Sequence, residues 1–191
     1  MSNDASTIIF ARPALGSDAA ARWIYDDVTE AEVVRRIAAS HDSVRSLYAY
    51  WRGRSNGCAM PSRGDIDPVD FPRHLPSVTL VDVVPDQRRF VYRLVGTQEV
   101  AGRGGDPTGQ AVGDAYYGES REAALGSYEY VVRSCRPFCV RDPYTTADGW
   151  EEQEDTLYLP LSADRTNVNM VLVYTHSATF RPRLISKLLQ A

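Results

Sequence analysis

The sequence predicts an α+β domain built on an antiparallel sheet. Two observations lead to this fold class: apolar residues alternate in two strand-like segments and later in three more, and helical patterns precede and separate these groups. The chain has 191 residues, of which 43% are hydrophobic and 24% charged, which is the composition of a folded globular domain. We therefore expect one domain of ordinary size with helical extensions.

The charge balance and the composition exclude several classes of protein. The chain carries 21 basic and 25 acidic residues, a net charge of −4, whereas nucleic-acid binders usually have a basic excess, so nucleic acid is not an expected partner. No stretch approaches the roughly 20 apolar residues of a membrane span, and the first residues lack the pattern of a signal peptide. Three cysteines are too few for a disulfide framework. We expect a cytoplasmic protein with no membrane partner.

Residues 1–28 are predicted to form an N-terminal arm. The segment mixes Asp, Ser, Gly and Pro with two apolar patches, Ile8–Phe10 and Trp23–Tyr25. Such an arm either stays loose or lays its patches on the domain or on a partner subunit. At the other end, residues 181–191 are predicted to form a short tail, in which Leu184–Leu189 has helical spacing.

Residues 29–52 are predicted to form one helix or a pair of helices. Thr29 and Glu32 have the spacing of a capping box, in which hydroxyl and carboxylate each accept a free backbone N–H. The segment Ser40–Ser43 interrupts the pattern. Either the helix continues through it, or Asp42 caps a second helix.

An apolar stripe with roughly heptad spacing runs along this region. It consists of Val33, Ile37, Val44, Leu47 and Trp51. The stripe packs on the chain's own domain, or it forms a dimer or partner interface, and its length does not decide between the two.

Residues 53–180 are predicted to form the domain core, which opens with a loop rich in Gly and Pro. A β-hairpin follows, because Ser77–Val84 and Arg89–Val95 are strand-like and Pro85–Gln87 between them has turn residues.

The second strand of this hairpin has a polar side and an apolar side. Phe90, Tyr92 and Leu94 alternate on one face, so Arg93 is expected to face solvent. If Arg93 instead faces inward, it needs a carboxylate, phosphate or backbone partner, because an unpaired buried charge is expensive.

The rest of the core is predicted to hold short helical turns, one amphipathic helix and three strands. The Gly-rich residues 96–118 favour short turns, and residues 119–133 have one apolar face and acidic residues in the first turn. The three strands are predicted over residues 137–144, 150–161 and 168–177.

Four segments in this order resemble a PAS domain, the sensory fold of many signalling proteins, and more narrowly a bacterial subfamily of compact, stand-alone PAS proteins. They are Met60–Pro68, His74–Asp82, Arg89–Thr97 and Gly105–Gly109. The resemblance spans roughly residues 44–180. It implies a five-stranded antiparallel sheet with helices over one face, a small cavity for a ligand, and flanking helices and sheet surface for dimers or partners.

Six residues are candidates for a ligand site in such a cavity. They are Tyr92, Arg93, Tyr116, Tyr117, Tyr128 and Tyr144. Aromatic side chains with a few polar tips are typical of a small-molecule pocket, although the same residues also make an ordinary core.

No cofactor and no metal are expected. Flavin photosensors of this fold carry Asn-Cys-Arg-Phe on a helix, whereas this chain has Cys135–Cys139 at a junction between helix and strand. Haem is not expected, because the three histidines, His41, His74 and His176, lie outside the expected core or at loop and strand ends. The acidic run Glu151–Asp155 is expected to be a solvated strand edge rather than a cation site.

The sequence contains no recognisable catalytic motif. We therefore expect a non-catalytic sensory or adaptor module of bacterial signalling that binds a small ligand, a protein partner or a second copy of itself. Because the chain ends soon after Phe180, we expect no effector domain in it and an output through a partner. The alternative is a small enzyme that acts on a hydrophobic metabolite, with Tyr92, Asp114 and His74 as its first candidates.

Overall fold

A computed structural model describes residues 28–117, 120–145 and 151–177 of the chain. Their strands form one five-stranded sheet in the order β2-β1-β5-β4-β3, in which every neighbouring pair is antiparallel. The predicted α+β fold with a five-stranded antiparallel sheet is confirmed. The strands are β1 (Val78–Val83), β2 (Phe90–Val95), β3 (Phe138–Thr145), β4 (Glu151–Leu161) and β5 (Met170–Ser177).

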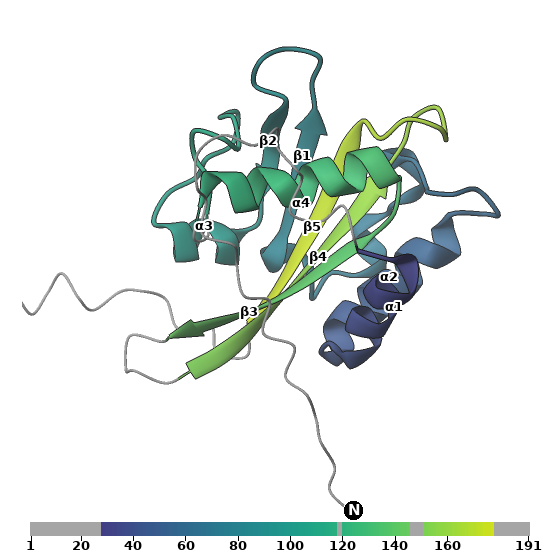
Figure 1. Ribbon diagram of the computed structural model, residues 1–191, viewed down its shortest axis with the longest axis horizontal. Helices are drawn as coiled ribbons and strands as arrows, with labels where there is room; N and C mark the ends of the chain where they lie inside the picture. The colour runs from purple at the N-terminus through teal and green to yellow at the C-terminus, as the bar shows by residue number, and fades with distance from the viewer. Residues whose placement is uncertain (1–27, 118–119, 146–150, 178–191) are drawn as a thin grey trace, which may run out of the picture.

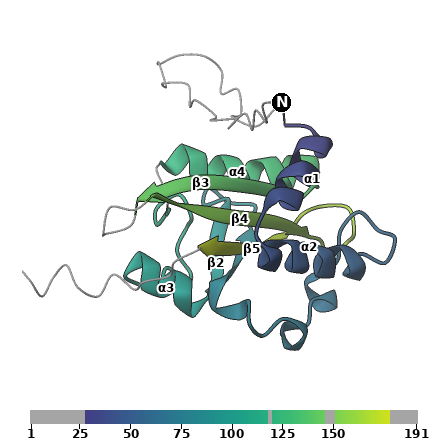
Figure 2. The ribbon, with the colours of Figure 1, turned by 90° about the horizontal axis from the view of Figure 1, so that it is seen from below.

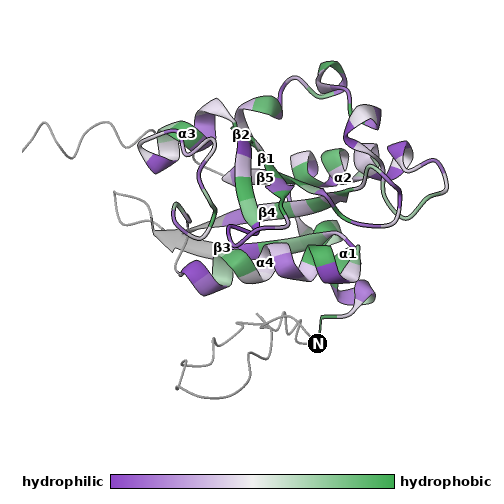
Figure 3. Cartoon of the chain, turned by 90° about the horizontal axis from the view of Figure 1, so that it is seen from above, coloured by the Kyte–Doolittle hydropathy of each residue, from purple (hydrophilic) through white to green (hydrophobic). Residues whose placement is uncertain are grey.

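Helices lie on both sides of this sheet (Figures 1 and 2). Helix α4 (Arg121–Ser134) crosses one face, and its Tyr128 ring meets Tyr158 of β4 with the ring centres 5.3 Å apart. The N-terminal helices, α1 (Glu30–Ala39) and α2 (Asp42–Arg54), pack against the other face. Hydrophobic residues mark the strands and recur along α4 (Figure 3). We call the two sides the α4 face and the α2 face.

Shorter helices fill the connections. Three 3₁₀ turns, η1 (Arg63–Asp65), η2 (Pro68–Asp70) and η3 (Leu75–Ser77), lie between α2 and β1, and α3 (Thr97–Arg103) follows β2 directly. The short turns expected between the hairpin and the long helix are thus present.

The N-terminal region is a helix pair rather than one helix. The Thr29 hydroxyl accepts the Glu32 N–H at 3.2 Å and caps α1, as predicted. The expectation that Asp42 caps the second helix is wrong by one residue. His41 is the N-cap, where its Nδ1 accepts the Ser43 N–H at 3.2 Å, and Asp42 in the first turn pairs with Arg45.

The apolar stripe of these helices lies in the chain's own core. Its members are 0 to 4% exposed: Val33, Ile37, Val44, Leu47 and Trp51. The Trp51 indole N–H also donates to the Pro160 carbonyl of β4 at 3.0 Å, which fixes α2 on the sheet. The stripe therefore packs the α2 face, and its side chains offer a partner no surface.

A β-bulge interrupts the alternation of β2. Leu80 of β1 pairs with Leu94 and Val81 pairs with Tyr92, so Arg93 is the extra residue between them. Beyond the bulge the side chains change faces, and Leu94 is 47% exposed instead of sharing the buried face of Phe90 and Tyr92. The predicted common face therefore holds for Phe90 and Tyr92 but not for Leu94.

Several predictions lie outside the described residues. These are the arm up to residue 27, the tail, and the turn between β3 and β4. The proposed limits of arm, helices, core and tail stay predictions. Among the helices that the structure does describe, none has the length and apolar character needed to cross a membrane.

Candidate functional site

A partly buried polar cluster gathers where α3 meets the α4 face. Its centre is Arg103, whose guanidinium carbon lies 5.1 Å from the centre of the Tyr92 ring and 5.0 Å from that of Tyr117. One guanidinium nitrogen donates to the Tyr92 hydroxyl at 3.1 Å. Two aromatic faces and a hydroxyl thus hold one cation in a fixed position, which is a strong arrangement when it is shielded from water.

This guanidinium is not fully satisfied. Its Nε is buried and has no hydrogen-bond partner among the described residues. Its nearest carboxylate, Glu99 one turn earlier in α3, has an oxygen 4.0 Å from Nη2, which is too long for a hydrogen bond. A buried donor without an acceptor costs about 1 to 3 kcal/mol, so the cluster retains capacity for another acceptor.

Two carboxylates share this single cation. Burial raises the pKa of Glu99 to about 7, which the positive charge of Arg103 partly opposes and the negative charge of Glu154 supports. Burial also raises the pKa of Glu154, and the nearby Asp142 carboxylate raises it further. The Glu99 and Glu154 carboxylates therefore take up protons at a higher pH than exposed glutamates do.

Tyrosine rings form the apolar side of the same cluster. Tyr128 is 5% exposed and packs between Phe90 and Tyr158, with ring centres 5.2 and 5.3 Å away. Burial raises the pKa of Tyr128 well above its usual value. The Tyr92 hydroxyl donates to the Ala115 carbonyl at 3.3 Å. The rings of Tyr92 and Tyr128 thus form a buried aromatic wall beside Arg103.

The six residues predicted for a ligand site do not share one environment. Tyr92 and Tyr128 are buried on the α4 face, and Tyr117 contacts Arg103 while it is 48% exposed. Tyr116 is 44% exposed. Arg93 faces solvent, as the alternation predicted, and pairs with Asp82 at 3.1 Å.

The sixth residue, Tyr144, lies in β3 and pairs with Glu152, and its side chain is outside the described ones. Sequence reasoning missed Glu99, Arg103 and Glu154. The i, i+4 spacing of the first two on one helix was the available signal.

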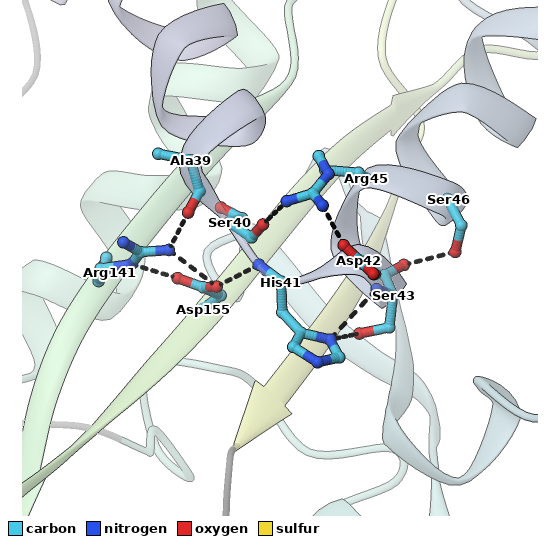
Figure 4. Close-up of polar contacts among 9 residues, drawn as sticks. All are labelled: Ala39, Ser40, His41, Asp42, Ser43, Arg45, Ser46, Arg141 and Asp155. Atoms are coloured by element: carbon cyan, nitrogen blue, oxygen red, sulfur yellow. Dashed lines mark hydrogen bonds and ion pairs between the residues drawn. The ribbon is translucent and has the colours of Figure 1, made fainter.

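A second polar cluster fixes the junction between α1 and α2 (Figure 4). Asp155 of β4, which is 5% exposed, accepts from Arg141 Nε at 2.7 Å and from the His41 backbone N–H at 2.9 Å. Arg141 also donates to the Ala39 carbonyl at 2.7 Å. The expectation of a solvated acidic edge is thus wrong for Glu154 and Asp155, because β4 is an interior strand with helices on both faces.

The cysteines do not fit covalent flavin chemistry on the α4 face. Cys139 of β3 lies 3.4 Å from the Ser40 hydroxyl on the α2 face, and Cys135 at the end of α4 contacts two backbone carbonyls. Cys58 is exposed in a loop.

The histidines lie apart from the Arg103 cluster. His41 and His176 stack with ring centres 3.7 Å apart, and burial lowers the pKa of His176, with the neighbouring His41 as a second cause. His74 packs edge-on against Tyr174 on the α2 face.

The residues suspected for an enzyme do not converge. Tyr92 points to the α4 face, His74 lies on the α2 face, and Asp114 is exposed in the loop before Tyr116. No group of three or more metal-ligating side chains occurs among the residues that the structure describes.

Solved structures with a similar fold include PAS and light-oxygen-voltage (LOV) domains. The PAS domain of BvgS from Bordetella pertussis is 15% identical, with 65% of this chain and 96% of that chain covered and a TM-score of 0.42. A light-oxygen-voltage domain studied with a flavin analogue is 12% identical, with coverages of 58% and 83% and a TM-score of 0.42. The LOV domain of a blue-light activated histidine kinase from Erythrobacter litoralis is 14% identical, with coverages of 53% and 94% and a TM-score of 0.39.

No curated protein matches the sequence. The family model described as PAS domain, in contrast, matches residues 39–174. That match runs from the end of α1 into β5 and contains the whole Arg103 cluster. This chain therefore belongs to the PAS domain family.

Proposed function

We propose that this protein is a non-catalytic sensory or adaptor PAS module whose ligand binds beside Arg103. PAS domains are the sensory fold of many signalling proteins, and the family assignment supports that role. The observation that carries the proposal is the Arg103 guanidinium, held by two tyrosine rings and with a buried Nε that has no acceptor among the described residues.

The ligand of this site is a small polar molecule. An acceptor on the molecule would satisfy Arg103 Nε, and a donor would pair with the buried Glu99 carboxylate, whose pKa is raised to about 7. Both residues belong to α3, which contacts η3 and follows β2 directly. A ligand that binds one position of α3 better than another shifts the domain toward that position. The output then passes to a protein partner or to a second copy of the chain.

Native mass spectrometry of freshly purified protein tests this function, because it reports bound small molecules and subunit count together. Arg103→Met should lose the bound molecule, and the matched control Arg93→Met, at an exposed arginine, should keep it. Glu99→Gln keeps the side-chain shape and provides a second variant if Arg103→Met fails to fold. A wild-type monomer with no ligand in this measurement and no partner in a pull-down would overturn the proposal.

The expectation that the protein holds neither flavin nor haem stays a prediction. The cysteine positions argue against a covalent flavin adduct on the α4 face, and they say nothing about a flavin held without a covalent bond. An absorbance spectrum of the purified protein decides the matter, because either cofactor absorbs visible light.

A further inference from the structure

A groove of about 440 Å³ lies on the α2 face, on the opposite side of the sheet from α4. Side chains of three strands form its floor, and the irregular segment that holds the 3₁₀ turns η1, η2 and η3 forms its wall. The floor residues are Val78, Leu80, Leu94 and Leu172, and the wall includes Ile66, Phe71, Leu75 and three prolines.

Apart from Arg63 and Thr97, the side chains that line the groove are apolar. Of its 14 lining residues Arg63 is the one that carries a charge. Its Nη1 donates to the Ile66 carbonyl at 2.8 Å, which holds the guanidinium at the rim. Arg63 forms no ion pair among the described residues, so its charge is free to pair with a bound anion. Leu75 and Leu94 remain 36% and 47% exposed in the groove.

The wall is held in place although it contains no long helix or strand. Asp65 accepts the Ser62 N–H at 2.7 Å and pairs with Arg165 at 2.8 Å. Tyr50 of α2 donates to Asp70 at 3.0 Å and accepts the Asp67 N–H at 2.9 Å. Because these bonds fix the wall from two sides, the groove is formed before any ligand arrives.

Backbone contact closes one end of the groove. A Cβ on Gly96 would lie 2.3 Å from the Pro76 carbonyl oxygen, so the chain after β2 touches the chain before β1 directly. A side chain at this position would push these segments apart. The groove is therefore bounded by packed backbone at this end and by the free charge of Arg63 at the rim.

We propose that this groove binds a free medium-chain carboxylate, with its alkyl chain on Leu80, Leu94 and Leu172 and its head group on Arg63. The volume falls within the range of small-molecule sites, about 300 to 1,000 Å³, and apolar walls with a few polar groups are typical of them. A protein partner would need about 800 Å² of contact surface, whereas the exposed apolar side chains of the lining are two leucines and two prolines, Leu75, Leu94, Pro68 and Pro72. The single unpaired positive charge selects an anionic head group. The site lies on the opposite face from the Arg103 cluster and does not depend on the proposed function.

Calorimetric titration of the full chain with decanoate, below its micelle concentration, tests the inference. Decanoate should bind saturably, and each methylene removed toward hexanoate should weaken binding about four-fold, as expected for alkyl burial. Leu94→Glu places a carboxylate in the groove and should weaken binding by at least about ten-fold. Arg63→Gln should weaken it about two- to five-fold, as expected for an exposed charge pair.

Matched variants separate this site from the rest of the surface and from the Arg103 cluster. Val69→Glu adds the same charge nearby at a side chain that is 80% exposed and does not line the groove, and it should leave binding unchanged. Arg73→Gln is the corresponding control for Arg63, and Arg103→Met should also bind decanoate normally. The proposal is overturned if decanoate does not bind, or if Leu94→Glu binds it as well as wild type. The proposal is also overturned if decanoate binding is lost in Arg103→Met but kept in Leu94→Glu. The same holds if the protein associates only with anionic vesicles or with an acidic amphipathic peptide.

Discussion

The two faces of the sheet are built on opposite principles. The α4 face holds ionisable groups out of water, with Glu99, Glu154 and the incompletely bonded Arg103 close together. The α2 face is mainly an apolar core under α1 and α2, with the bonded Asp155 at their junction, and it continues into an apolar groove with one charge at its rim. Stability should therefore depend on the protonation of glutamates on the α4 face and mainly on apolar packing on the α2 face. Substitutions on the two faces should change the free energy of unfolding in different ways.

The largest effect is expected from the core of the α2 face. Trp51→Ala removes a side chain that is 1% exposed together with its indole hydrogen bond to Pro160. The free energy of unfolding in urea should fall by about 4 kcal/mol. Trp51→Phe keeps most of the packing and should cost about half as much. If both variants lose less than about 1 kcal/mol, α2 does not carry the core of this face.

Glu99→Gln should change the pH dependence of stability. Burial raises the pKa of Glu99 from 4.5 to about 7. Between these pH values the native Glu99 holds a proton that the unfolded chain has released, so the contribution of Glu99 to stability falls as pH rises through this range and then levels off. Relative to wild type, the variant should therefore gain stability as pH rises through this range, by on the order of 3 kcal/mol at alkaline pH.

Chemical unfolding across this pH range measures the effect. Glu122→Gln, an exposed residue in the first turn of α4, serves as the control and should keep the wild-type profile. A stability difference between Glu99→Gln and wild type that does not grow between pH 4.5 and 7 would contradict the raised pKa.

The junction between α1 and α2 depends on a buried carboxylate. Asp155→Asn keeps the shape but weakens the bonds to Arg141 and to the His41 N–H, so stability should fall by about 2 kcal/mol. Asp42→Asn, in the exposed pair with Arg45, should change stability by less than about 0.5 kcal/mol. Equal effects of the two changes would show that burial does not strengthen the Asp155 bonds.

The smallest effect is expected at the bulge of β2. The Arg93 side chain is 59% exposed and pairs with Asp82 at 3.1 Å. Arg93→Gln should therefore change the free energy of unfolding by less than about 0.5 kcal/mol in a thermal or urea titration. A loss several times larger would show that Arg93 has a buried partner, which is the inward orientation that the sequence had left open.

Local patterns in the sequence predicted the strands and helices well, because alternation, turn residues and capping residues act over a few positions. The sequence did not predict the bulge at Arg93, because the bulge depends on how β2 pairs with β1 and not on β2 alone. Of the predicted ligand residues, Tyr92 and Tyr128 lie at or beside the polar cluster. The charged residues of this cluster are not predictable from the sequence, because Glu99 and Arg103 on a short helix have the pattern of a solvent-exposed pair. Their burial depends on how the helix packs on the sheet. Glu154 and Asp155 were misread because the acidic run looked like an edge, whereas the sheet order places β4 inside.

Because of the bulge, strand β2 contributes side chains to both faces of the sheet. Tyr92 on one side holds Arg103 through its hydroxyl, and Leu94, two residues later on the other side, lines the groove. A molecule beside Arg103 and a molecule in the groove would thus act on the same six-residue strand. Thermodynamic linkage then makes the two sites reciprocal. If a ligand beside Arg103 changes the affinity of the groove for its ligand by some factor, the ligand in the groove changes the affinity of the Arg103 site by the same factor.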